Sequence, residues 1–393
     1  MYIALLGRQP ALGVAELESL YGASNVAWFS DISATIAADD FDFNRLGGSQ
    51  KAGRVVAKLH GTWRQASMQI VKAYTAAWSN HEGKITLGIS AYGFPDSPRD
   101  IQKTGIILKK KLREHNVSLR LLPNNEAALN TAASHHNKLG LSDNHVELLV
   151  IRSKTGHILV AESVGAQNIT AFAARDQARP KTDAFVGMLP PKLARMMVNM
   201  SAGTLTQTHN KSTPIVLDPF CGTGVVLQEA AILGYNTYGT DLSDKMVDYT
   251  TANLTWLTGL YANITQPTVT TGDATTHTWQ TPIHAVACET YLGQPFSAPP
   301  SPAKLQEVRG NCNHIISTFL TNISRQLQSG TPLCIAVPAW RSAEGTFTHL
   351  PFIDSLEQLG YTRRELKNAR ADQLLYYRDT QVVARELLLL TKS

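Results

Sequence analysis

The chain has 393 residues, of which 43% are hydrophobic and 17% are charged, and its formal net charge is +5. That length predicts two or three domains, and that composition predicts a soluble globular protein with packed cores. No run of 18 apolar residues occurs, and no basic segment precedes the apolar amino terminus, so the sequence predicts neither a membrane span nor a signal peptide. We therefore expect a cytoplasmic protein.

Residues 1–80 predict a compact α+β unit, because strand-like and helix-like patterns alternate along them. A glycine-containing turn at residues 46–53 interrupts the alternation. The unit ends in a helical pattern at residues 64–78.

Residues 81–170 predict a second α+β unit, and the positive charge of the chain is concentrated around it. Residues 81–200 contain 16 basic and 10 acidic side chains. The densest basic cluster lies in the helical pattern of residues 104–115. There we expect Ile106, Ile107 and Leu108 to pack on one side while the lysines stay in solvent.

This basic face favours a nucleic-acid partner, because binding to a phosphate backbone requires positive charge. An ordinary solvated surface is the alternative interpretation. A second helical pattern ends near residue 137, where further polar groups could meet phosphates. The residues that we expect at such a surface are Lys109, Lys110, Lys111, Arg113, Asn137 and Lys138.

Residues 171–195 predict a semi-rigid linker. Proline follows Arg179 and recurs at positions 190 and 191, which keeps the backbone extended just ahead of an apolar helix. We expect Met196, Met197 and Met200 of that helix to be core residues.

Residues 215–224, with the sequence IVLDPFCGTG, predict the start of a cofactor pocket. Three apolar residues form a short buried strand and Asp218 ends it. Gly222 and Gly224 then let the backbone turn closely past a ligand before a helix begins. In an open α/β sheet, ligands bind beyond the carboxyl ends of the strands, at such turns.

Two further acids end the next predicted strands and indicate the kind of ligand. Asp241 follows the glycines by about 20 residues, where a carboxylate can hold ribose hydroxyls, and Asp273 ends a third strand. Because an acid precedes the glycines, an anionic pyrophosphate would be repelled and a cationic ligand favoured. The pattern resembles the methyltransferase sheet that binds S-adenosylmethionine. Another Rossmann-like fold with a glycine turn is the alternative.

The four cysteines occur singly, at positions 221, 288, 312 and 334. None has CxxC spacing, so the sequence predicts no zinc site and no disulfide framework. We expect reduced, mostly buried thiols and no bound metal. Cys221 lies inside the glycine turn, which leaves a role as a nucleophile as a further alternative.

Several motifs resemble those of a family of RNA-modifying enzymes. The segments that resemble a THUMP domain, the RNA-binding module of several tRNA-modifying enzymes, are residues 92–115, 118–122, 135–140 and 160–180. With the amino-terminal segments LLGRQPALGVAELESL and LGGSQKAGRVVAKL and with the linker, they resemble the archaeal and eukaryotic tRNA guanosine N2-methyltransferases that act on position ten.

The resemblance covers nearly the whole chain and implies an α/β fold of four parts. These are a ferredoxin-like α+β domain (1–80), a THUMP-like RNA-binding domain (81–170), a linker (171–195) and a Rossmann-like class I methyltransferase domain (196–393). It also implies S-adenosylmethionine as the cofactor, tRNA as a partner, and an activating protein subunit of the kind that some related eukaryotic enzymes need. The cofactor would be bound by Asp218, Phe220, Cys221, Gly222, Gly224, Asp241, Leu242, Asp273 and Ala274.

The acceptor motif departs from the family pattern. The family carries DPPY after the fourth strand, whereas this chain has ETYLG at residues 289–293. Glu289, whose side chain is one methylene longer than the aspartate of DPPY, would orient the amine. Tyr291 would stack on the base, which is worth about 1 to 3 kcal/mol. Without the prolines the turn has more freedom, and a misplacement of about 1 Å can cost roughly a hundredfold in rate.

Three functions therefore stay open. The protein methylates the exocyclic N2 of a guanosine in tRNA, or it methylates another RNA or DNA position, or it binds RNA and cofactor without turnover. Near the carboxyl terminus we expect Trp340 and Arg341 on the ligand side of the sheet, where they could contact a substrate. We expect Arg385 to be a structural residue of a closing hairpin.

Overall fold

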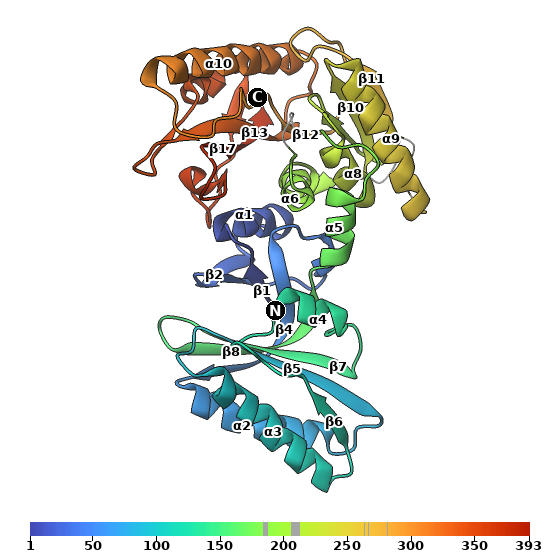
Figure 1. Cartoon of the computed structure of the whole chain (residues 1–393), viewed down its shortest axis with the longest axis vertical. Coiled ribbons are helices and arrows are strands. Elements are labelled where there is room, and N and C mark those ends of the chain that lie inside the picture. Colours follow the sequence, from blue (N-terminus) through green and yellow to red (C-terminus); the bar gives the residue numbers. More distant parts are fainter. Residues whose placement is uncertain (184–187, 206–212, 263, 266, 281) are drawn as a thin grey trace. The chain divides into compact units, whose positions relative to one another are not determined.

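The computed structural model describes residues 1–393 apart from 184–187, 206–212, 263, 266 and 281, so part of the predicted linker lies outside the described residues. The chain forms two compact units, and Figure 1 labels most of their elements. Unit 1 consists of residues 1–10, 24–44 and 49–171, and unit 2 of residues 11–23, 45–48 and 172–393. No helix in the described part of the chain is long and apolar enough for a membrane crossing.

Unit 1 is built on one sheet of eight strands in the order β2-β3-β1-β4-β8-β7-β5-β6. The strands are β1 (Tyr2–Leu6), β2 (Val26–Ser30), β3 (Ser33–Ile36), β4 (Ser49–His60), β5 (Lys84–Tyr92), β6 (Ser118–Leu121), β7 (His145–Arg152) and β8 (His157–Ala166). Antiparallel pairing of β4 with β8 joins the strands of residues 1–80 to those of residues 81–170. The two predicted segments share this sheet, and their division into separate domains stays a prediction.

Two long helices, α2 (Trp63–Trp78) and α3 (Pro98–Glu114), pack against each other and share a hydrophobic core with the strands. α3 begins after Ser97, whose side chain accepts a hydrogen bond from the backbone N–H of Asp100. The shorter helical elements are η1 (Phe43–Arg45), α4 (Thr131–His136) and α5 (Ile169–Gln177), of which η1 and α5 each lie partly in unit 2.

Unit 2 contains an α/β sheet with the main strand order β11-β10-β9-β12-β13-β17-β15. The strands are β9 (Ile215–Asp218), β10 (Asn236–Asp241), β11 (Thr268–Thr271), β12 (Ala285–Glu289), β13 (Pro332–Arg341), β14 (Phe347–Thr348), β15 (Tyr361–Arg363), β16 (Leu375–Tyr376) and β17 (Val383–Lys392). β9 to β13 run parallel, and β17 is antiparallel to β13 and β15. The strand order reverses at β9, and such a switch point is where open α/β sheets bind ligands.

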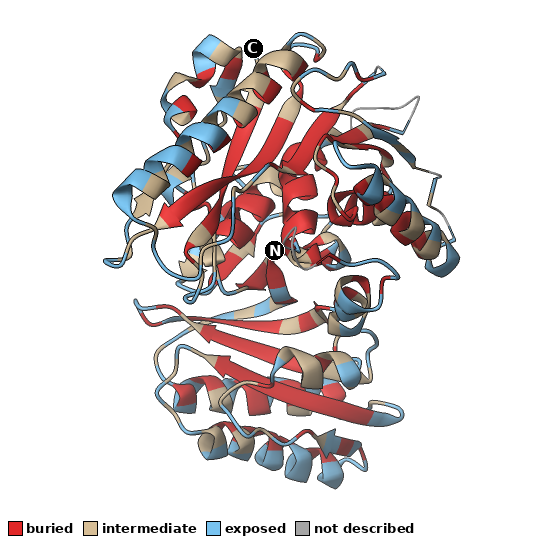
Figure 2. Cartoon of the chain, turned by 45° about the horizontal axis from the view of Figure 1, so that its top comes forward, coloured by how far each residue is buried: buried red, intermediate tan, exposed pale blue. Residues whose placement is uncertain are grey.

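Helices cover both faces of this sheet, and alternate side chains of each strand belong to opposite cores. In β12, Ala285 and Ala287 pack with α6, whereas Val286 and Cys288 pack with α10. Figure 2 shows the central strands buried along most of their length. The helical elements are α1 (Pro10–Tyr21, in this unit from Ala11), α6 (Pro191–Ala202), α8 (Val225–Ile232), α9 (Asp244–Leu260), α10 (Pro302–Ser324), η2 (Pro351–Leu359) and η3 (Ala371–Gln373).

α6 packs against α8, β12 and β13 and is buried around most of its circumference. Met196, Met197 and Met200 are at most 6% exposed, which confirms that they are core residues. Unit 2 includes the chain from residue 172 onward, well ahead of the predicted boundary at residue 196.

Candidate active site

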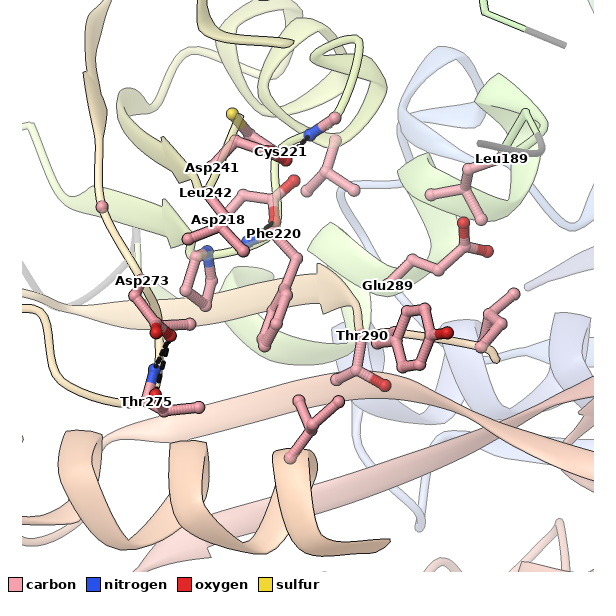
Figure 3. A pocket seen from close by; sticks show the side chains of 18 of the residues that line it. Leu189, Asp218, Phe220, Cys221, Asp241, Leu242, Asp273, Thr275, Glu289 and Thr290 are labelled. Atoms are coloured by element: carbon pink, nitrogen blue, oxygen red, sulfur yellow. Dashed lines mark hydrogen bonds between the residues drawn. The ribbon is translucent and has the colours of Figure 1, made fainter. Parts of the chain in front are cut away.

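The carboxyl ends of β9 to β12 open onto one cavity of about 760 Å³ in unit 2 (Figure 3). That volume lies within the range of small-molecule sites. The sequence-predicted residues that line it are Asp218, Phe220, Cys221, Gly222, Asp241, Leu242, Asp273, Ala274, Glu289 and Tyr291. The structure therefore brings together side chains from four strands that are far apart in the sequence.

Gly224 is a predicted cofactor residue that does not line this cavity. It immediately precedes α8 with a φ of +84°, and a Cβ there would lie 2.9 Å from the side chain of Thr250. Gly222, which does line the cavity, also has a positive φ of 51°. Glycine adopts a positive φ without strain, so Gly224 allows the backbone turn although it does not contact the cavity.

Asp218 ends β9 and is only 2% exposed. Its Oδ1 accepts a hydrogen bond of 3.1 Å from the backbone N–H of Phe220. Burial raises the pKa of this carboxyl well above its usual value, and the negative charges of Asp241 and Glu289 raise it further. A cation in the cavity would relieve this unfavourable environment.

Asp241 and Asp273 brace the loops that they begin. Asp241 accepts hydrogen bonds of 2.9 Å from the backbone N–H groups of Gly222 and Ser243, one on each oxygen. Asp273 accepts from the backbone N–H and the hydroxyl of Thr275 through Oδ1. An ionised carboxylate has about four acceptor sites, so both retain capacity for a ligand.

Phe220 and Leu242 give the cavity its apolar surface. The ring of Phe220 packs edge-on against Phe319 of α10, with 5.0 Å between the ring centroids. Leu242 is 73% exposed directly after β10. Both side chains offer apolar contact to a flat ring beside the carboxylates.

α10 supplies a wall of the cavity that the sequence analysis missed. His314 and Ile315 line it together with Thr318, which lies about one helical turn farther along. One turn farther on, Asn322 donates hydrogen bonds to the carbonyl oxygens of Ala274 and His277, which ties α10 to the loop after β11. No motif marks these residues. The other lining residues that were not predicted are Leu189, Pro219, Thr223, Val225, Val226, Gly272, Thr275, Thr290, Leu292 and Gly293.

Glu289 ends β12 and forms an ion pair with Arg385 of β17, whose Nε–H donates to Oε1. The glutamate side chain is 15% exposed. Burial raises its pKa above the usual value, and the charge and hydrogen bond of Arg385 offset part of this rise. Arg385, expected to be a structural residue, therefore contacts the predicted acceptor acid directly.

The residues after Glu289 form a turn without the family prolines. The backbone N–H and the hydroxyl of Thr290 both donate to the carbonyl oxygen of Ala336, at 2.9 and 3.0 Å. These bonds fix the start of the turn, where the family pattern has a proline ring. Tyr291 follows at the cavity and is 42% exposed, so its ring is accessible.

All four cysteines are free and buried. Burial raises the pKa of the Cys221 thiol well above its usual value, and the charges of Asp218 and Asp241 add to the shift. The thiol is therefore protonated at neutral pH, which argues against the nucleophile alternative. Within the described residues, no group of three or more His, Cys, Asp or Glu side chains could hold a metal ion.

Trp340 and Arg341 were expected on the ligand side of the sheet. Trp340 is 1% exposed within a hydrophobic core, so a substrate contact by its side chain is wrong. Arg341 lies over the ring of Tyr377, with 5.3 Å to the ring centroid, and donates to the carbonyl oxygen of Asp379. A substrate contact by Arg341 stays a prediction.

The predicted phosphate-binding residues lie in unit 1. Lys109, Lys110, Lys111 and Arg113 are exposed on α3, and Lys138 is exposed after α4. The side chain of Asn137 donates to the carbonyl oxygen of Ala133 at 2.8 Å and so helps to end α4.

The packing face of α3 differs from the prediction. Ile106 and Ile107 are 56% and 47% exposed. Three consecutive residues cannot share one face of a helix, because each step turns by about 100°. The residues that pack are instead spaced by three or four and are Ile101, Thr104, Gly105, Leu108 and Leu112.

Comparisons with known proteins match parts of this chain to a methylase family and to named methyltransferases. Residues 71–252 match a family described as DNA methylase. Over 171 residues the chain is 31% identical to a protein named tRNA (guanine(10)-N2)-dimethyltransferase from Methanothermobacter thermautotrophicus, a match that covers 43% of this chain and 45% of that protein. Over 87 residues it is 38% identical to a protein of the same name from Pyrococcus abyssi, covering 22% of each. The matches thus span less than half of these relatives.

Among solved structures, the chain is similar to TrmN from Thermus thermophilus. The TM-score is 0.53 at 16% sequence identity, and the likeness covers 100% of this chain and 99% of that one. This likeness supports the fold along the whole chain.

Proposed function

We propose that the protein transfers the methyl group of S-adenosylmethionine to the exocyclic N2 of a guanosine in tRNA. The observation that carries this proposal is the convergence of Asp218, Asp241, Asp273 and Glu289 on one cavity. The relatives named tRNA (guanine(10)-N2)-dimethyltransferase support the choice of acceptor.

S-Adenosylmethionine would supply a methyl group that is activated by a positively charged sulfur. In the proposed site the buried carboxyl of Asp218, just ahead of the glycine turn, favours a cation. Asp241 holds the ribose hydroxyls and Asp273 the adenine amine, while Leu242 packs on the adenosine. Opposite charges attract strongly inside a cavity of low dielectric constant, which suits this ligand.

Glu289 accepts a hydrogen bond from the N–H of the target amine, which points the nitrogen lone pair at the methyl group. Tyr291 stacks on the base that carries the amine. Because the leaving group is already activated, the site needs alignment rather than covalent help.

Unit 1 binds the tRNA in this proposal, as a THUMP-like module. Basic side chains that are exposed on α3 would contact the phosphates of the tRNA. They are Lys109, Lys110, Lys111 and Arg113. A small activating subunit stays a prediction.

A second candidate is methylation of DNA or of another RNA position. It is favoured by the match to a family described as DNA methylase and by the ETYLG loop, which differs from DPPY. A third is binding without turnover, favoured by the engagement of Glu289 with Arg385.

Transfer of tritiated methyl groups from S-adenosylmethionine separates these candidates. The acceptors are a pool of unmodified tRNA transcripts, duplex DNA, single-stranded DNA and none. We expect labelling of tRNA alone. The Glu289→Ala variant should lose about a hundredfold or more in rate, as expected when a positioned acid–base group is removed, while cofactor affinity measured by calorimetry changes little.

Labelling of DNA instead of tRNA would favour the second candidate. Cofactor binding without transfer to any acceptor would contradict the enzymatic proposal and favour the third.

A further inference from the structure

Glu289 and Arg385 meet across an intervening strand. Glu289 is in register with Ala336 of β13, and Arg385 is in register with Pro338 of the same strand. Because β13 lies between β12 and β17, two strand spacings, or roughly 9.5 Å, separate the two backbones. Only two long side chains can bridge that distance.

Strand alternation places both side chains on one face of the sheet. Ala287 of β12 and Leu387 of β17 belong to the core that includes α6. Glu289 and Arg385 each lie two residues from these positions and so share their face. Ala336 of β13 belongs to the same core, and its small side chain leaves room for the ion pair to pass over the strand.

We propose that Arg385 is a positioning residue for the acceptor: it holds Oε1 of Glu289 so that Oε2 faces the cavity and accepts a hydrogen bond from the target amine. This inference rests on the proposed function. Glu289 lines the cavity, and no described residue donates a hydrogen bond to Oε2. Figure 3 shows its carboxylate on the side of Leu189, away from Asp273.

The pair also accounts for glutamate in place of the family aspartate. An aspartate at position 289 would end one methylene short of Arg385. In the DPPY pattern two prolines restrict the backbone that carries the acid. Here the turn lacks them, and the carboxylate is held at its tip by an arginine from another strand.

The surroundings make Arg385 the cation that acts on Glu289. The ionisable groups at the cavity or electrostatically linked to Glu289 are Asp218, Cys221, Asp241, Asp273, Cys288, Tyr291, His314 and Arg385. On α6, which packs against β12, Arg195 pairs with Glu229 of α8 and Lys192 lies over Phe172. Arg385 lowers the pKa of Glu289 that burial raises, and the acceptor needs the ionised form.

The test is the pH dependence of methyl transfer to the tRNA transcript pool between about pH 5 and 9. The variants are Arg385→Gln, Arg385→Lys, Glu289→Asp and the double variant Glu289→Asp/Arg385→Gln. The matched control is Arg363→Gln, because Arg363 of β15 pairs with Glu386 of β17 and lines no part of the cavity.

For Arg385→Gln we expect kcat to fall about a hundredfold, while KM for tRNA changes by less than about threefold. The acid limb of kcat/KM should move to higher pH, because Glu289 loses its cation. Arg385→Lys should keep the acid limb and lower kcat, because charge remains and geometry is lost. The double variant should be no slower than either single variant, since both remove one interaction.

An active wild type with an unchanged Arg385→Gln variant would overturn this inference and leave the proposed function standing. So would additive losses in the double variant, or an equal loss in Arg363→Gln. If Arg385→Gln does not fold, Arg385→Lys and Glu289→Asp carry the same test. A wild type that transfers no methyl to tRNA would overturn the proposed function, and the inference with it.

Discussion

Asp218 lies almost fully buried beside two other carboxylates, which costs free energy unless a proton or a cation neutralises the charge. Because burial raises the pKa of Asp218, the free protein keeps a proton on this carboxyl to higher pH than on an exposed aspartate. A bound cation stabilises the carboxylate and releases that proton. Cofactor affinity and pH are therefore linked at this residue.

Calorimetry of S-adenosylmethionine binding in two buffers of different ionisation enthalpy measures this release. We expect protons to leave when the cofactor binds at a pH below the raised pKa of Asp218, and affinity to rise with pH until that pKa is passed. The neutral thioether S-adenosylhomocysteine should release fewer protons. Equal release from wild type and Asp218→Asn would show that the linkage lies elsewhere.

Several residues of the site were predictable because each follows a local rule. Asp218 and Asp241 end β9 and β10, Asp273 follows β11 by two residues, and parallel strands bring their carboxyl ends to one edge. The contact between Glu289 and Arg385 was not predictable. It depends on which strand neighbours β13, and nothing in the residues around position 385 states that order.

At the scale of elements, α3 presents its basic cluster to solvent while a stripe spaced by three and four residues packs on the sheet. The exposed Ile106 and Ile107 show that the run of apolar residues was a poor guide to the buried face. α10 is the converse case. Its cavity-facing His314 and Thr318 follow only from helical periodicity and from where the helix docks.

Replacement of Lys109, Lys110 and Lys111 by alanine tests the role of α3. We expect weaker binding to all tRNA sequences, and a plot of log affinity against log salt that is flatter by about 2 to 3, because about one counterion is released per lysine–phosphate contact. Fluorescence anisotropy with labelled tRNA transcripts between about 50 and 300 mM salt measures both.

The matched control replaces Lys58, Lys84 and Lys154, which are exposed on or beside other elements of unit 1. It removes the same positive charge as the α3 variant. A control with the same loss of slope would show a general charge effect. A triple variant of α3 with the wild-type slope would place the tRNA elsewhere.

At the scale of the whole molecule, the chain crosses between its two units more often than a linear reading predicts. Residues 11–23 and 45–48 belong to unit 2, although the sequence places them inside an amino-terminal domain. The sheet of unit 1 combines residues 1–80 and 81–170 through the pairing of β4 with β8. Such long-range pairing has no local signal, whereas the parallel strands of unit 2 follow from the repeated strand, turn and helix pattern.

The central claim is that the protein transfers a methyl group to a guanine amine of tRNA in one cavity lined by acids. The direct measurement is mass spectrometry of nucleosides from tRNA transcripts incubated with the protein and trideuteromethyl S-adenosylmethionine. The account predicts N2-methylguanosine carrying the deuterated methyl group, and its loss in Glu289→Ala. The same label in another nucleoside, or in none while the cofactor still binds, would contradict it.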